Sequence, residues 1–295
     1  MSEFSDDWLA LRAPADSAAR ADRLVADLAG LPAAGSGVLE VLDLGCGTGA
    51  NLRHLAPLLA AAGHSEQRWT CVDHDSVLLA RLPARIRAWS EALWLDACSA
   101  DAGLCVRTAA WRAEVVWDAL DLAAEVQRLP LPAGGLVTAS ALLDLVSDPW
   151  LAALLPRCRA AGCALLFVLS YDGRCALTPA HPDDPRVVAL VNQHQRMDKG
   201  FGPALGPAAV ATAANRCRAL GYGVRLAPSD WHIGPGQAVL QRALLAGWRD
   251  AAAERAAIEA GAGAWLDDWH AAHLARSEAG ALRLRVGHMD LLARP

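Results

Sequence analysis

Lysine and clustered positive charge are what this sequence lacks most. Lys199 is the single lysine among 27 basic residues, and 32 acids leave a formal charge of −5. Binding to nucleic acid or to an anionic membrane surface needs clustered cations. The longest strongly apolar run, residues 163–169, is far too short to span a bilayer. The acidic N-terminus, MSEFSDDWLALRAP, lacks the apolar segment of a secretion signal. We therefore expect a soluble, cytoplasmic protein whose partner is neither nucleic acid nor a membrane.

Paired cysteines are also missing. The eight cysteines contain no C-x-x-C and no paired metal-ligand spacing. Several lie in apolar runs, as Cys71 in WTCVD and Cys163 in GCALLFVLS, where a thiol behaves as a small hydrophobic group. We expect free thiols and no bound metal. With 295 residues, 54% of them apolar, the chain is long enough to bury a large core, which excludes a disordered protein.

Short apolar runs alternate with helical patterns through the first 173 residues. After a helix at 16–30, strands are predicted at 38–45, 69–75, 113–122, 135–147 and 163–173, with intervening helices at 50–62, 76–93 and 148–162. This alternation predicts an α/β fold with a mostly parallel sheet and helices on both faces. Ligands of such sheets bind beyond the carboxyl ends of the strands. Functional side chains should therefore follow residues 44, 72, 121, 139 and 170.

The second half of the chain interrupts this alternation. Residues 174–203 carry four prolines, two histidines and the single lysine around a short helical centre at 186–195. A polar insertion after a strand's carboxyl end is well placed to act as a lid. Beyond it we predict a helix at 207–223, a strand at 222–233, helices at 236–260 and 263–279, and a closing strand at 282–294. The two late strands complete a doubly wound, Rossmann-like sheet of seven strands.

A glycine-rich turn follows the first predicted strand. Asp43-Leu-Gly45-Cys-Gly47-Thr-Gly49 leads directly into a helix, whose N-terminus presents free N–H groups. The three glycines permit a tight turn and close approach of a ligand to the backbone. Gly45-x-Gly47-x-x-Ala50 also fits a dinucleotide fingerprint. A carboxylate at Asp43, however, would repel a pyrophosphate and suits a cation such as the ammonium group of an amino acid.

Two further acids follow the next strands. Asp73 ends the second strand, 24 residues after Gly49, where a carboxylate can accept both hydroxyls of a ribose. Asp121-Leu122 follows the third strand and could place a carboxylate against an adenine amino group, with Asp118 as the alternative for that role.

These segments resemble the class I S-adenosylmethionine-dependent methyltransferases. The matching segments are V-L-D-L-G-C-G-T-G (41–49), C-V-D (71–73), A-L-D-L (119–122) and L-V-T-A-S-A-L-L-D (136–144), and the resemblance covers about residues 14–172. It implies that S-adenosylmethionine is the cofactor, with Asp43 near its ammonium group, Asp73 on its ribose and Asp121 on its adenine. The cofactor-binding residues that it implies are Asp43, Gly45, Cys46, Gly47, Thr48, Gly49, Asn51, Asp73, His74, Asp121, Leu122 and Ser140.

Two motifs of related enzymes are absent from the sequence. The segment after the fourth strand has no Asn/Asp-Pro-Pro-aromatic run, which disfavours methylation of an adenine or glutamine amino group. No cysteine stands where the cytosine-C5 enzymes have their nucleophile.

Methyl transfer from a sulfonium ion depends mainly on in-line orientation, and a positioned base adds ~10²–10⁴-fold where the acceptor must lose a proton. The residues that could serve catalysis are Tyr171, Asp144, His181 and His194, and those that could bind substrate are Asp172, Arg196, Lys199 and Trp231. The plainer interpretation makes the insertion histidines a turn and a solvated helix face, and Trp231 core packing. A metal site made of His181, Asp183, Asp184 and His194 lacks a strong ligand spacing.

The sequence thus predicts a methyltransferase that acts on a small molecule and releases S-adenosylhomocysteine. Residues 1–34 would cover the cofactor site, 35–173 bind the cofactor, 174–206 form the lid, and 207–295 complete the sheet and cap the substrate. A homodimer is the assembly we consider. The alternatives are an inactive S-adenosylmethionine-binding regulatory subunit and an NAD(P)-dependent oxidoreductase. The latter is disfavoured because the single lysine, preceded four residues earlier by Gln195, cannot build a Tyr-x-x-x-Lys pair.

Overall fold

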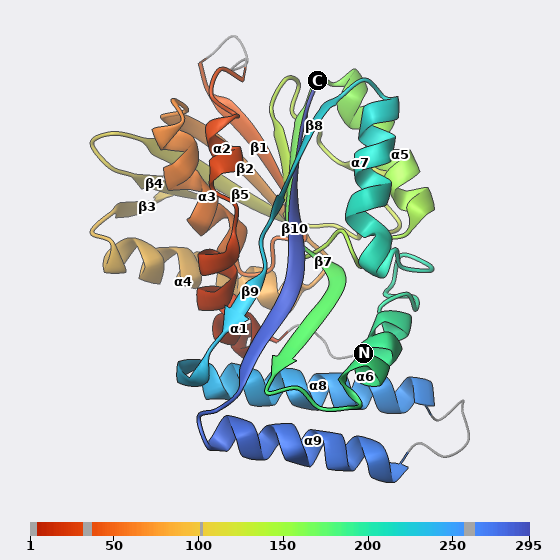
Figure 1. Ribbon diagram of the computed structural model, residues 1–295. Helices are drawn as coiled ribbons and strands as arrows, with labels where there is room; N and C mark the ends of the chain where they lie inside the picture. Colours follow the sequence, from red (N-terminus) through yellow and green to blue (C-terminus); the bar gives the residue numbers. More distant parts are fainter. Residues whose placement is uncertain (1–4, 32–36, 101–102, 257–262) are drawn as a thin grey trace.

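A computed structural model describes residues 5–31, 37–100, 103–256 and 263–295 (Figure 1). The predicted N-terminal segment 1–34 and the predicted helix 236–260 therefore lie partly outside the described residues.

Seven strands form the doubly wound sheet. Its parallel part has the order β5-β2-β1-β6-β7, followed by β10, antiparallel to β7, and β8, antiparallel to β10. The bounds are β1 Leu39–Leu44, β2 Glu66–Asp73, β5 Arg112–Ala119, β6 Leu136–Ser140, β7 Ala164–Thr178, β8 Gly223–Pro228 and β10 Arg283–Arg294. The α/β, mostly parallel fold predicted from the sequence is confirmed.

Three shorter strands extend this sheet within the described ranges. β3 (Asp96–Ala100) and β4 (Gly103–Arg107) add an antiparallel hairpin at the β5 edge, and β9 (Trp231–Ile233) pairs with β10. The predicted strand 222–233 is therefore two strands. It is interrupted where Ser229 N donates to His288 O at 3.0 Å and where Asp230 turns to accept hydrogen bonds from arginines.

Helices cover both faces of the sheet. On one face lie α2 (Arg23–Ala26), α3 (Ala50–Ala61) and α4 (Ser76–Ala92), and on the other α5 (Asp148–Ala160) and α7 (Ala209–Ala219). Val41 belongs to the first core and its neighbour Leu42 to the second. Burial on both faces explains why apolar residues occupy both sets of alternating positions in β1.

A third core lies beyond the carboxyl ends of the strands. It contains side chains of α1 (Asp6–Ala19), α6 (Asp184–His194), α8 (Ala238–Ala256), α9 (Gly263–Glu278), β9 and the distal parts of β7 and β10. Figure 1 shows β7 running out of the main sheet toward the stacked helices α8 and α9. Short 3-10 turns occur at Val126–Arg128, Gly206–Ala208 and Pro235–Gln237.

The predicted helix 16–30 has the wrong bounds. α1 begins ten residues earlier, where Ser5 Oγ accepts from Trp8 N at 3.1 Å as its N-cap. It ends before Arg20, because Ala21 N donates to Asp290 Oδ2 at 2.8 Å instead of continuing the helix. Leu24 and Leu28 still pack into the core, as their spacing predicts. None of the helices in the described ranges is both long and apolar enough to cross a membrane.

Candidate functional site

The glycine-rich segment forms a tight corner between β1 and α3. Gly45, Gly47 and Gly49 have φ of 64°, 52° and 79°, in the left-handed region that L side chains rarely adopt. Gly45 N and Cys46 N both donate to Val72 O, at 2.9 and 3.1 Å, which holds the corner against β2. The thiol of Cys46 is buried, and contact with Cys71 and burial raise its pKa, so it is a packing group rather than a nucleophile.

Asp73 lies against this corner, as the spacing predicted. Its Oδ2 accepts from Gly47 N at 2.8 Å and its Oδ1 accepts from Asp75 N at 2.9 Å. A carboxylate has about four lone-pair sites, so Asp73 retains capacity for further donors. His74 is largely exposed, with Nδ1 3.5 Å from Asp73 Oδ1, and Thr48 is buried, its carbonyl accepting from Arg53 Nη1 at 2.5 Å.

Asp43 is the most deeply buried acid of the corner. Its Oδ1 accepts from Asn51 Nδ2 at 2.7 Å, whereas its Oδ2 is buried and has no hydrogen-bond partner among the described residues. Burial raises the pKa of Asp43 to about 7, although the Asn51 hydrogen bond and the charge of Arg20 act in the opposite direction. An orphaned buried oxygen of this kind is costly unless a ligand satisfies it.

Arg20 completes this polar cluster, and the sequence reasoning missed it. Its Nη1 donates to Asn51 Oδ1 at 2.6 Å and its Nη2 to Ser140 Oγ at 3.0 Å. Its Nε is buried without a hydrogen-bond partner in the described part of the chain. Arg20 follows α1 in a segment without a motif, so the only signal for it was a positive charge within residues expected to cover the site.

The acids after β5 are placed differently. Asp121 is exposed, and its Oδ1 accepts from the N–H groups of Ala123 and Ala124 at 2.9 and 3.2 Å, which caps the turn after the strand. Leu122 is buried, and its carbonyl accepts from Trp150 Nε1 at 2.6 Å. The alternative acid, Asp118, is also exposed.

Helix α1 covers the glycine corner. A Cβ placed on Gly47 would lie 3.3 Å from Leu9 Cδ1, so this leucine sits directly against the turn. At the start of the same helix, Asp6 accepts hydrogen bonds from Arg81 and Arg85 of α4, each at 2.7 Å. These hydrogen bonds attach the start of α1 to α4 over the glycine corner.

A second polar cluster lies past the end of β6, beside the distal half of β7. Asp144 is buried, and its Oδ1 has no hydrogen-bond partner within the described ranges. Burial raises its pKa to about 6, opposed by its own backbone N–H, the charge of Arg12 and the N–H of Tyr171. The phenol of Tyr171 donates to Asn192 Oδ1 at 2.7 Å, and burial raises its pKa.

Aromatic rings line this second cluster. His288 lies between Tyr171 and Trp231, with ring centroids 6.2 and 5.0 Å away, and its pKa is lowered to about 4 by burial and by Arg12. Arg12 of α1 stacks over Trp231 at 5.1 Å, and Trp231 Nε1 donates to Asp16 Oδ1 at 3.1 Å. Tyr171, Asp144 and Trp231 were named as candidates from the sequence, whereas His288 and Arg12 were not.

The two histidines and the lysine of the predicted lid contact α8, α9 or one another, whereas Asn192 of the same segment accepts from Tyr171 of the second cluster. His194 Nε2 lies 3.1 Å from Glu254 Oε2 on α8, and Lys199 Nζ donates to His194 Nδ1 at 3.3 Å. His181 precedes α6 and stacks near His273 of α9, with ring centroids 5.9 Å apart.

The remaining residues predicted in or near the lid are also accounted for. Arg196 is exposed, and its Nη1 donates to the carbonyl of Asn192 at 3.3 Å. Asp172 accepts from Arg174 Nε at 2.8 Å. The metal site considered from the sequence is not assembled, because its two histidines stand at opposite ends of α6. No other group of metal-binding side chains occurs in the described ranges.

Two strained residues mark the same edge of the sheet. Ala141, after β6, and Leu169, in β7, have φ of 52° and 55° although neither is a glycine. Such backbone strain concentrates at functional sites. Leu169 is held by Asp290, whose Oδ1 accepts its N–H at 2.7 Å.

No family model matches the chain, and no curated protein matches it. Several solved structures do match. A cyclopropane-fatty-acyl-phospholipid synthase-like protein from Lactobacillus casei is 12% identical, with a TM-score of 0.47, over 95% of this chain and 98% of that one. Phosphoethanolamine N-methyltransferase 2 from Haemonchus contortus, in complex with phosphomonomethylethanolamine and S-adenosylhomocysteine, is 13% identical, with a TM-score of 0.45, over 99% and 58%.

A further match is an O-methyltransferase family protein from Burkholderia thailandensis. It is 16% identical, with a TM-score of 0.42, over 77% of this chain and 58% of that one. At these identities and scores the matches are likenesses of fold. The function is therefore argued from the residues of this chain alone.

Proposed function

We propose that this chain is an S-adenosylmethionine-dependent methyltransferase that acts on a small-molecule acceptor. The observation that carries the proposal is that Arg20 and Asp43, both hydrogen-bonded to Asn51 beside the glycine corner, each keep an unpartnered polar atom. The pair presents an unpartnered guanidinium N–H and an unpartnered carboxylate oxygen. Opposite charges with free hydrogen-bonding capacity are complementary to the ammonium and carboxylate groups of an amino acid.

The residues present fit this cofactor. Asp43 Oδ2 would accept from the ammonium group, Arg20 would donate to the carboxylate, and Asp73 would accept from the sugar hydroxyls. Binding would thus satisfy the orphaned atoms that burial makes costly. A nicotinamide dinucleotide fits less well, because its pyrophosphate would meet the carboxylate of Asp43 rather than a cation.

S-adenosylmethionine, when bound, supplies a methyl group on a positively charged sulfur, which is an activated electrophile. The protein's task is then to orient the acceptor and to exclude water, and orientation alone can supply roughly 7–11 kcal/mol. The third core, formed by α1, α6, α8 and α9, lies beyond the strand ends and provides the walls for a small acceptor. The acidic net charge disfavours a nucleic-acid acceptor.

We assign the base, where the acceptor must lose a proton, to Asp144 rather than to His181 or His194. Asp144 Oδ1 is buried without a partner among the described residues, so it is free to accept a proton. Its pKa of about 6 suits a base near neutral pH. Both histidines instead interact with residues of α8 and α9.

Equilibrium binding of S-adenosylmethionine tests the assigned pocket. Arg20→Gln removes a charge-assisted contact, so we expect affinity to fall about 10–100-fold. Asp73→Ala should weaken binding as well. Arg23→Gln, an exposed arginine three residues along, is the matched control and should bind like wild type. Unchanged affinity in Arg20→Gln and Asp73→Ala would reject the pocket.

Turnover separates the enzyme from its alternatives. Release of S-adenosylhomocysteine with any acceptor supports the enzyme. Binding of S-adenosylmethionine without turnover across an acceptor panel would favour a regulatory subunit. A thermal shift produced by NADH but not by S-adenosylmethionine would favour an oxidoreductase.

A further inference from the structure

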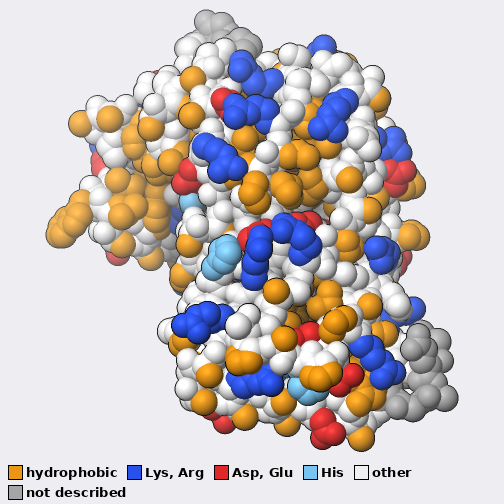
Figure 2. Space-filling model, viewed as in Figure 1, with side chains coloured by type: hydrophobic (Ala, Val, Ile, Leu, Met, Phe, Trp, Pro, Cys, Tyr) orange, Lys and Arg blue, Asp and Glu red, His pale blue; other side chains and the backbone are white. Residues whose placement is uncertain are grey.

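A cavity opens on the far part of β7, beyond the glycine corner. Its volume is about 260 Å³, enough for a small organic ion, and it is lined by Gly173, Arg174, Cys175, Ala176, Val188 and Arg285. Figure 2 shows basic and acidic side chains gathered in the middle of this face, between the main sheet and the stacked helices α8 and α9. The cavity thus lies beside α6, one of the helices proposed as walls for the acceptor.

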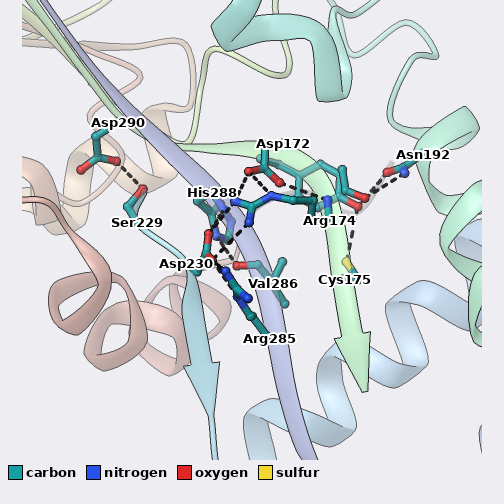
Figure 3. A network of polar contacts seen from close by, with 12 residues as sticks. Asp172, Arg174, Cys175, Asn192, Ser229, Asp230, Arg285, Val286, His288 and Asp290 are labelled. Atoms are coloured by element: carbon teal, nitrogen blue, oxygen red, sulfur yellow. Dashed lines mark hydrogen bonds and ion pairs between the residues drawn. The ribbon is translucent and has the colours of Figure 1, made fainter. Parts of the chain in front are cut away.

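Two arginines that line the cavity donate hydrogen bonds to largely buried carboxylates. Arg174 Nε donates to Asp172 Oδ2 at 2.8 Å and its Nη2 to Asp230 Oδ1 at 2.9 Å, and Arg285 Nε donates to Asp230 Oδ2 at 2.7 Å. Figure 3 shows Asp230 between the two guanidinium groups. Burial alone would raise the pKa of Asp230, but hydrogen bonds from Arg285 and His288 N lower it below its ordinary value, so it is ionised.

The two arginines are much more exposed than the two aspartates that bind them. The side chains of Asp172 and Asp230 are 14% and 5% exposed, whereas those of Arg174 and Arg285 are 51% and 52% exposed. The carboxylates accept from all three guanidinium nitrogens of Arg174 and from Nε and Nη2 of Arg285, which leaves Arg285 Nη1 without a carboxylate partner among the described residues. The four formal charges sum to zero, so binding here would depend on directed N–H groups rather than on a net positive field.

The cavity is connected to the second polar cluster through Cys175. The phenol of Tyr171 lies 3.4 Å from Cys175 Sγ, and Tyr171 N contacts the carboxylate of Asp144. His288, whose ring stacks near Tyr171, donates its backbone N–H to Asp230 Oδ1 at 3.1 Å. Cys175 is therefore the lining residue that leads from the cavity toward Tyr171, the neighbour of Asp144.

We propose that Arg174 and Arg285 form an anion subsite that binds a carboxylate or phosphate group of the acceptor. The acceptor would be a small anionic molecule whose nucleophilic atom lies toward Asp144. The identification of the bound anion as part of the methyl acceptor rests on the proposed function. The anion subsite itself can be tested independently of that function.

Protection of Cys175 from alkylation reports on the cavity directly. The full-length protein is treated with N-ethylmaleimide, and modification of the Cys175 peptide is followed by mass spectrometry. The separate probes are acetate and inorganic phosphate, each compared with chloride at equal ionic strength. We expect one or both anions to slow Cys175 modification several-fold and saturably while leaving Cys98, a partly exposed thiol elsewhere, unaffected. The anion that protects at the lower concentration identifies the group.

Arg285→Gln should abolish this protection while its circular dichroism spectrum remains that of the folded protein. Arg283→Gln, an exposed arginine on the same strand, is the control and should retain protection. Equal modification rates with and without either anion, or protection that persists in Arg285→Gln, would overturn the subsite. Because Arg174 still holds Asp230 in that variant, Arg174→Gln provides a second, independent test.

Saturating S-adenosylhomocysteine separates this inference from the proposed function. Protection that persists with it bound supports an acceptor site distinct from the cofactor site. Protection that it competes away would overturn the acceptor assignment. Should S-adenosylmethionine and S-adenosylhomocysteine fail to bind while the anions still protect Cys175, the methyltransferase proposal fails and the anion subsite stands.

Discussion

At the scale of single residues, Asp43 imposes a cost on folding that a ligand would relieve. Its folded pKa of about 7 lies above the ordinary 3.8, so between these pH values the folded protein holds a proton that the unfolded chain has released. Stability consequently falls as pH rises through this window and stays lower above it. If Asp43 had no role in binding, a neutral side chain at this position would make the folded protein more stable at these pH values.

Asp43→Asn should therefore stabilise the free protein. Each pKa unit corresponds to about 1.4 kcal/mol, and the pKa of about 7 already includes the opposing charge of Arg20, so we expect a gain of up to about 4 kcal/mol at pH 8 and little gain at pH 4. Urea unfolding at the two pH values measures this difference. S-adenosylmethionine should raise the unfolding midpoint of wild type but not of the variant. A variant less stable than wild type at pH 8 would show that the buried charge carries no such penalty.

At the scale of elements, α1 acts as a strap across the glycine corner. Its first turn is tied to α4 through Asp6, its middle places Leu9 on Gly47, and its last turns pack on β9 through Arg12 and Asp16. The pKa of Asp6 is lowered chiefly by the hydrogen bond from Arg85, so its charge is retained in the folded state. A cofactor in the corner would be covered by this helix.

Asp6→Asn should loosen the strap. Loss of the charged contacts to Arg81 and Arg85, both partly exposed, should cost about 1 kcal/mol and speed dissociation of S-adenosylmethionine several-fold. Stopped-flow displacement measures the rate, and hydrogen exchange in residues 9–19 reports the loosening. Asp7→Asn is the matched control, because it removes an acid from the same helix start without touching α4. Equal effects of the two substitutions would assign the result to the helix dipole instead.

The elements that the sequence predicted are those with strong local patterns. Strands buried on both faces, such as β1 and the first half of β7, appear as short segments dominated by apolar residues, and the helices after them carry apolar residues at helical spacing. The β3–β4 hairpin went unseen because Asp96–Ala100 is short, half-exposed and built of small residues. The division of 222–233 into β8 and β9 depends on Asp230, whose partners lie on other strands.

The residues of the candidate site also fall into two groups, those that a local sequence pattern indicates and those that it does not. Glycines and acids that end a strand are local signals, so Asp43, Gly47 and Asp73 were found from their spacing and lie together. Arg20 and His288 come to the site from the two ends of the chain. Only contacts between residues far apart in the sequence place them there, so no local sequence pattern could have predicted them.

At the scale of the whole molecule, the unpartnered buried groups are concentrated where the three cores meet. Within the described residues, six buried side-chain polar atoms have no partner, and four of them belong to Arg20, Asp43, Asp144 and Ser170. Asp43 lies near the end of β1, Asp144 follows β6, Ser170 lies in β7 just past its pairing with β6, and Arg20 lies in the segment after α1. Native interiors satisfy nearly all such groups, so this clustering marks a surface built for a ligand.

Asp290 ties these parts of the molecule together. This buried side chain on β10 accepts from Ala21 N at 2.8 Å, from Leu169 N at 2.7 Å and from Ser229 Oγ at 2.6 Å. It thereby connects the residue after Arg20, the strained position in β7 and the turn between β8 and β9. These three donors occupy its carboxylate, so Asp290 is a positioning residue and not a ligand contact.

Asp290→Asn should weaken cofactor binding from a distance. An amide nitrogen in place of one oxygen would face a donor, which should cost about 1–3 kcal/mol of stability and release the backbone that positions Arg20. We expect S-adenosylmethionine affinity to fall several-fold, measured by calorimetry beside urea unfolding. Ser229→Ala, the control, removes one hydrogen bond of the same carboxylate but leaves Ala21 held, so it should lower stability by about 1 kcal/mol with affinity unchanged. If both variants lose affinity in proportion to their stability, Asp290 acts through global stability, and its link to Arg20 is refuted.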